Sequence, residues 1–187
     1  MVVDFNLEES WEQIPDRELF YYLERESRKL VEVAWADETV DAVMQEFANL
    51  TIASLRNERL QLSQPQDGAW HFYADDPDAK RAEKIVILWA ESFNQKVQAG
   101  AGNALALNAL KVALENGEVE LVDVEADIAQ LESESLGISA YVQTSLSQKE
   151  SLPITRTSSL GEYIFFGAIT MLFLSVLGIL FSGKAHE

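Results

Sequence analysis

Four carboxylates follow the spacing of a calcium-binding loop in the stretch DVEADIAQLESE. Asp123, Glu125, Asp127 and Glu134 fall at the first, third, fifth and twelfth positions of such a loop. The sixth position requires glycine because the chain turns sharply there, and this chain has Ile128 instead. The same residues fit one amphipathic helix, so we predict a helix here and no metal site.

A second cluster that could do chemistry begins at His71, which three aspartates follow in the stretch HFYADDPD. Asp75, Asp76 and Asp78 could ligate a metal with this histidine or form an enzyme site. A lone histidine before an aspartate run is more often part of a helix-capping loop, and the chain has no cysteine and no Glu-x-x-His pair. We therefore predict no catalytic, cofactor-binding or metal-binding residue. The alternative function is a membrane-tethered enzyme with an unrecognised site near His71.

A run of carboxylates without any lysine or arginine separates Lys111 from Lys149. Its eight members are Glu115, Glu118, Glu120, Asp123, Glu125, Asp127, Glu132 and Glu134. Helices that are merely solvated tend to mix both signs of charge, because opposite charges four residues apart attract each other. We predict that this run docks a basic protein surface, and the alternative is a solvated helix face. The predicted partner-binding residues are Glu118, Glu120, Asp123, Glu125 and Asp127, with Trp70 in a turn.

The composition limits the partners further. The chain has 187 residues, a net charge of −17 and no cysteine, which excludes disulfides and thiolate metal sites. Residues 1–150 contain 12 Lys and Arg against 29 Asp and Glu, so this part carries the whole net charge. Such a domain repels phosphate backbones, and we exclude nucleic acid as a partner. The length allows one soluble domain of about 150 residues.

From Tyr163 to Phe181 the chain forms an uncharged run of 19 residues. As a helix that rises about 1.5 Å per residue, this run would span roughly 28 Å, close to the hydrocarbon core of a bilayer. Twelve of its residues are Leu, Ile, Val or Phe, and their insertion free energies sum to roughly −5 kcal/mol. A core helix of this length would carry more polar residues than Thr170 and Ser175. We therefore predict a transmembrane helix that contacts the lipid bilayer from Tyr163 to Phe181.

The flanks of this run predict its orientation. The N-terminus, MVVDFNLEES, lacks the basic and apolar regions of a secretory signal peptide. Lys149 and Arg156 precede the run and Lys184 follows it, so the positive-inside rule weakly favours a cytosolic N-terminal domain. Only SGKAHE follows the run. We expect a tail-anchored, single-pass membrane protein.

Apolar residues recur at helical spacing through most of the acidic part. This pattern predicts an all-α fold, with a soluble domain of about five helices followed by a single C-terminal transmembrane helix. Five helices are expected: from Asp16 to Ala34, from Val40 to Leu55, after Pro77 and Asp78 as far as Phe93, from Asn103 to Asn116 and from Leu121 to Leu131. The stretches SQPQDGAW and QAGAG should be turns before and after the third helix. Its centre, IVILWA, is apolar on all sides, which predicts the most buried helix.

These elements divide the chain into four parts. Residues 1–137 form the acidic helical domain, residues 138–160 a Ser/Thr-rich linker, residues 161–182 the transmembrane anchor and residues 183–187 a short tail. The function that fits this organisation is a docking, assembly or regulatory module for a membrane-associated protein complex.

Overall fold

The computed structural model of the chain describes residues 2–6, 16–63, 69–147, 152–155, 164–165 and 167–174. The chain divides into two compact units, Met1–Leu152 and Pro153–Glu187. The first unit contains the acidic domain, and the second contains the apolar run.

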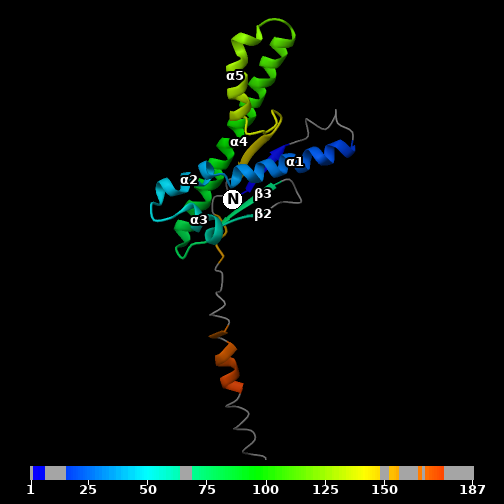
Figure 1. Cartoon of the computed structure of the whole chain (residues 1–187). Coiled ribbons are helices and arrows are strands. Elements are labelled where there is room, and N and C mark those ends of the chain that lie inside the picture. Colours follow the sequence, from blue (N-terminus) through cyan, green and yellow to red (C-terminus); the bar gives the residue numbers. More distant parts are fainter. Residues whose placement is uncertain are drawn as a thin grey trace, which may run out of the picture. The chain divides into compact units, whose positions relative to one another are not determined.

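The first unit is mainly helical, as the sequence predicts (Figure 1). Its helical elements are α1 (Asp16–Ala34), α2 (Asp37–Glu46), α3 (Ile52–Ser54), the π-helical turn η2 (Leu55–Arg59), α4 (Ala79–Glu115) and α5 (Leu121–Glu134). It also contains the strands β1 (Val2–Asn6), β2 (Leu60–Ser63), β3 (Ala69–Ala74) and β4 (Gln143–Ser147). The prediction of an all-α fold is therefore corrected to a mainly helical domain with one small sheet.

The four strands form one antiparallel sheet in the order β2-β3-β1-β4. Residues in β3 alternate between its two faces, because Trp70 and Phe72 are buried whereas Tyr73 is 49% exposed. This alternation is typical of a strand with one face on a core. The pairing of β1 with β4 places Val2 opposite Ser147. Partners so far apart in the sequence leave no local signal of their pairing.

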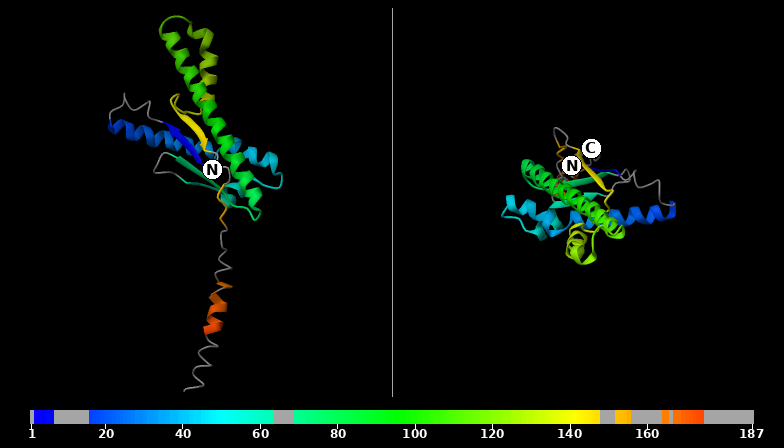
Figure 2. Two further views of the ribbon diagram at one scale, coloured as in Figure 1. Left: turned by 180° about the vertical axis from the view of Figure 1, so that it is seen from behind. Right: turned by 90° about the horizontal axis from the view of Figure 1, so that it is seen from above.

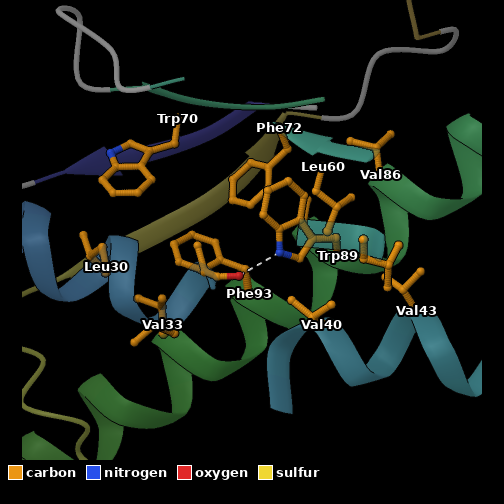
Figure 3. Packing of buried hydrophobic residues seen from close by; sticks show 14 of the residues in the cluster. Leu30, Val33, Val40, Val43, Leu60, Trp70, Phe72, Val86, Trp89 and Phe93 are labelled. Carbon is orange, nitrogen blue, oxygen red and sulfur yellow. Dashed lines mark hydrogen bonds between the residues drawn. The ribbon is translucent and has the colours of Figure 1, made fainter. Parts of the chain in front are cut away.

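The hydrophobic core lies between the buried face of the sheet and the helices α1, α2 and α4 (Figures 2 and 3). Trp89 of α4 is completely buried at its centre. Its indole Nε1–H donates a hydrogen bond to the Ala34 carbonyl oxygen at 2.8 Å (Figure 3). The Trp89 ring also lies 4.9 Å from the Trp35 ring and 4.6 Å from the Phe72 ring, centroid to centroid. The buried position predicted for the centre of this helix is confirmed.

The second predicted helix is wrong at its C-terminal end. The helix predicted from Val40 to Leu55 ends at Glu46, and a new helix, α3, begins after Thr51. The Thr51 side chain accepts a hydrogen bond from the Ser54 backbone N–H, and the Ser54 hydroxyl accepts one from the Thr51 backbone N–H. This reciprocal pair is a capping box, and it marks the start of a new helix. The apolar pattern of the sequence continues across this point and predicts a single helix.

The predicted third and fourth helices are one helix, α4, which runs for 37 residues through the glycines of QAGAG. Gly100 is buried where α4 meets the turn after α5. A Cβ atom at Gly100 would lie 2.9 Å from both the Ser135 carbonyl oxygen and the Ile138 Cδ1 atom. This glycine therefore serves close packing of the backbone and does not interrupt the helix.

Two glycines of α4 give a matched pair of stability predictions. Gly100→Ala forces the Ser135 backbone to move, so we expect it to destabilise the domain by about 1–3 kcal/mol. Gly102→Ala meets no atom within 4 Å, and should stabilise it by about 1 kcal/mol through the higher helix propensity of alanine. Urea unfolding of the full chain in nanodiscs, followed by circular dichroism, measures both changes. Equal effects of the two substitutions would contradict the packing at Gly100.

The first part of the predicted linker belongs to the folded domain. Ile138 and Val142 are buried in the core, and residues 143–147 form β4. The Ser139 backbone N–H also donates a hydrogen bond to the carboxylate of buried Glu26 at 3.1 Å. Ser145 and Ser147 occupy exposed positions of this edge strand, whereas Thr144 is half-buried. The prediction that residues 138–147 belong to a linker is therefore wrong.

The second unit contains the described part of the predicted membrane span. Residues 164–165 and 167–174 are helical, and all of them are exposed. Tyr163, Phe166 and residues 175–181 lie outside the described residues, as does the predicted tail. Within the described ranges, no helix has both the length and the hydropathy that crossing a membrane requires.

Candidate functional site

Two of the three aspartates after His71, Asp76 and Asp78, have structural roles. The Asp76 carboxylate is 3% exposed and forms ion pairs with Arg59 and Arg81. The Asp78 carboxylate accepts a hydrogen bond from the Lys80 backbone N–H at 2.9 Å and caps the N-terminus of α4. The helix-capping role predicted for this loop is confirmed for Asp78. His71 itself lies in β3, with its ring 6.3 Å from that of Tyr73.

No metal-binding cluster is present among the residues that the structure describes, where no three His, Asp or Glu side chains lie close enough together to hold an ion. Asp76 is neutralised by two arginines, and Asp78 is engaged by the helix terminus. The alternative of an enzyme site near His71 therefore gains no geometric support from these two aspartates.

The prediction that Trp70 lies in a turn is wrong. The residue lies in β3, is only 4% exposed and stacks on Phe93 of α4 at a centroid distance of 6.1 Å (Figure 3). The aspartate and glycine before it suggest a turn, but the alternation of Trp70 and Phe72 with His71 and Tyr73 is that of a strand. Trp70 is thus a core residue and is removed from the predicted partner contacts.

The other predicted contact residues lie on a helical hairpin made of α5 and the C-terminal half of α4. This hairpin projects beyond the sheet and α1 (Figures 1 and 2). Helix α4 ends at Glu115, and Gly117 follows with a φ of 72°. A left-handed residue at this place is a common helix terminator and favours glycine. The predicted helix end at Asn116 and Gly117 is therefore confirmed.

The hairpin brings the five predicted carboxylates together at its tip and along α5. Glu118 and Glu120 lie in the connection between the helices, and Asp123, Glu125 and Asp127 lie on α5. All five side chains are exposed. In the part of the chain that the structure describes, the carboxylates of this acidic run form one ion pair, between Glu132 and Lys111 at 2.9 Å.

Helix α5 presents two different acidic sides. Asp123, Asp127, Gln130 and Glu134 recur at intervals of four, three and four residues, so they share one side of the helix. Glu125 and Glu132, seven residues apart, lie on another side, where Glu132 pairs with Lys111 of α4. Among the described ion pairs, those of the acidic run therefore lie on the side of Glu132, and Asp123 and Asp127 on the other side form none.

An open groove of about 570 Å³ runs between α4 and α5 on the side of Asp127. Its lining residues are Ala106, Ala109, Leu110 and Ala113 of α4 and Asp127, Gln130 and Leu131 of α5. The α4 residues recur at i, i+3, i+4 and i+7, which is one face of a helix. The spacing of these residues is visible in the sequence, but the groove depends on where α5 packs.

Large apolar side chains are exposed on the same hairpin. Val112 of α4 is 54% exposed, and Leu121 and Val122 at the start of α5 are 55% and 84% exposed. Leu105 of α4 is 60% exposed. Single exposed apolar residues are common, but these accompany a groove and a charged helix side, a combination found at protein docking sites.

No protein-family model, curated protein or solved structure matches this chain. Its function is therefore inferred from the hairpin, which combines exposed carboxylates with an apolar groove.

Proposed function

We propose that the protein is a single-pass membrane protein whose acidic helical domain lies in the cytosol. There it serves as a docking, assembly or regulatory module for a membrane-associated protein complex. The observation that carries this proposal is the projecting α4–α5 hairpin with its exposed carboxylates (Figure 1). Among the residues that the structure describes, Glu132 is the one carboxylate of the acidic run that forms an ion pair.

The charge pattern of α5 favours a binding role over mere solvation. Asp123 and Asp127 are four residues apart, and such a like-charge pair destabilises a helix by about 0.2–0.5 kcal/mol. A lysine four residues from either aspartate would give a favourable pair instead. A partner with lysine or arginine on its surface removes the repulsion when it binds, so the pattern fits a basic protein surface.

The membrane attachment is supported by the apolar run from Tyr163 to Phe181. Every described residue between Ile164 and Leu174 is exposed, including Phe165, Leu172 and Phe173 at 63–69%. A helix that is apolar on all sides belongs in a protein core or in a bilayer. Lys149 and Arg156 before the run favour the cytosol for the acidic domain.

Neutralising the hairpin tests the docking role. We expect the fourfold variant Glu118→Gln, Glu120→Gln, Asp123→Asn and Glu125→Gln to keep its helicity and to bind the partner about tenfold more slowly, because charge complementarity mainly accelerates association. The partner is first purified with the full native chain from gently solubilised membranes. Its association rate is then measured on the full chain in nanodiscs of neutral lipid.

The matched control neutralises four carboxylates elsewhere on the domain: Glu38, Glu58, Glu83 and Glu91. This control changes the net charge of the chain by the same amount and leaves the hairpin intact. Its association rate should stay within about twofold of the native value, since steering depends on where the charge lies. Equal slowing by both fourfold variants would show that only net charge matters and would contradict docking at the hairpin.

A further inference from the structure

The groove on the hairpin follows one face of helix α4. Its four α4 residues, Ala106, Ala109, Leu110 and Ala113, cover two turns of one face. Three of them are alanines, and small residues allow a neighbouring helix to approach within about 8–10 Å, axis to axis. The groove between α4 and α5 is open to solvent and is lined mainly by apolar side chains.

The two margins of the groove differ in chemistry. The α4 margin is apolar and continues into the exposed side chains of Leu105 and Val112. The α5 margin carries Asp127, with Asp123 one turn before it on the same side. An occupant must therefore present an apolar stripe toward α4 and positive charge toward α5.

We infer that this groove binds one amphipathic helix of a basic partner protein, with its apolar stripe on the α4 alanines and its Lys or Arg side chains against Asp123 and Asp127. In helix-in-groove binding, the bound helix inserts apolar residues at positions i, i+3, i+4 and i+7 into the groove. The inference rests on the proposed function and identifies the structural form of the partner.

Charge argues against the other occupants. A second copy of this chain would bring the same carboxylates against each other, because a symmetric interface pairs a surface with itself. Residues 7–15 contain Glu8, Glu9 and Glu12 and no Lys or Arg, so they offer no complementary charge either. Like charges placed opposite each other suppress such contacts.

A synthetic helix tests the inference without the natural partner. The probe is a peptide of about 18 residues, or five helical turns, with Leu and Ala at i, i+3, i+4 and i+7 and with Lys on the flanks. One control peptide has Glu in place of Lys, and another has the same composition with the apolar stripe scrambled. Binding to the full chain in nanodiscs of neutral lipid is followed by fluorescence anisotropy, and empty nanodiscs report binding to lipid alone.

Two protein variants separate the groove from the rest of the hairpin. Ala109 lies in the groove and is exposed, so Ala109→Phe fills the groove without overpacking the core. Ala129 is exposed on α5 and is not among the groove residues, so Ala129→Phe is the matched control. We expect Ala109→Phe to weaken the Lys peptide about tenfold or more and Ala129→Phe to change it by less than about twofold.

The outcomes distinguish this inference from the proposed function. Selective binding of the Lys peptide that Ala109→Phe removes supports the groove. If Asp123→Asn with Asp127→Asn weakens the peptide while Ala109→Phe does not, the groove inference falls and acidic docking stands. Equal binding of the Lys and scrambled peptides would also contradict the inference that the groove binds an amphipathic helix. Sedimentation that shows a dimer in detergent, dissociated by Ala109→Phe, would assign the groove to a second copy and overturn the inference.

Discussion

Replacing Trp89 with alanine is expected to lower the free energy of unfolding by about 3–5 kcal/mol, the usual range for removing a large buried aromatic side chain. Trp89 is completely buried between the sheet and α2 (Figure 3). The substitution leaves a cavity against Phe72 and Trp35, and it also removes the hydrogen bond to the Ala34 carbonyl oxygen. That carbonyl lies in the core and would lose its partner, which adds to the cost of the cavity.

Urea unfolding of the full chain in nanodiscs, followed by far-ultraviolet circular dichroism, measures this loss. Tyr73→Ala is the control, because Tyr73 is aromatic but 49% exposed on the other face of β3. We expect that control to cost about 1 kcal/mol or less. Trp70→Ala should resemble Trp89→Ala, since Trp70 is also buried. A loss at Trp89 no larger than that at Tyr73 would contradict the core described above.

The second large effect concerns membrane attachment. Arginine near the centre of a transmembrane helix costs about 2.5–3.5 kcal/mol on insertion scales, whereas leucine contributes about −0.3 to −0.6. The double change Leu172→Arg and Leu174→Arg therefore raises the insertion free energy by roughly 6–8 kcal/mol. This exceeds the roughly −5 kcal/mol available from the apolar run. We expect the variant to leave the membrane fraction almost completely.

Extraction of membranes with alkaline carbonate, followed by immunoblotting of pellet and supernatant, measures this release. The matched control adds the same two charges outside the run, as Tyr141→Arg and Ile154→Arg, at side chains that are 57% and 62% exposed. The control should remain in the pellet with the native protein. A double variant in the run that also stays in the pellet would show that residues 163–181 do not attach the protein to the membrane.

The helices of this domain were predictable where a single apolar face is continuous in the sequence. Helix α5 is the clearest case, because Leu121, Val124, Ile128 and Leu131 recur at helical spacing and the observed helix contains all four. Helix α4 was divided wrongly, since a glycine that a turn requires looks the same in sequence as one that allows close packing. Gly100 is of the second kind. It allows close packing against the Ser135 backbone, which lies 35 residues further along the chain.

The sheet could not be predicted because its pairing is non-local. Strand β4 is rich in serine and threonine, and it is stabilised by partners from distant parts of the chain. The Thr144 hydroxyl donates a hydrogen bond to the amide oxygen of Asn94 on α4 at 2.7 Å. Strand β1 also pairs with β4 along the whole length of β4. Neither partner is visible in the local composition, which resembles that of a linker.

The candidate site was predictable in its charge but not in its shape. The acidic run is a local property of the sequence, and five of the six predicted contact residues lie together on the hairpin. The sixth, Trp70, was misplaced because its neighbours suggest a turn. The division of α5 into a paired side and an unpaired side depends on how it packs on α4, where Lys111 reaches Glu132. The groove beside Asp127 follows from the same packing.

The dependence of partner association on salt tests docking at the acidic hairpin most directly. The Debye length falls from about 30 Å at 0.01 M salt to about 8 Å at physiological salt and about 3 Å at 1 M. The association rate of the native chain with its partner should therefore fall steeply across this range, by about tenfold or more. In the fourfold hairpin variant at Glu118, Glu120, Asp123 and Glu125, this decrease should become much smaller. A native rate that is independent of salt, or the same salt dependence in both proteins, would contradict docking through the acidic hairpin.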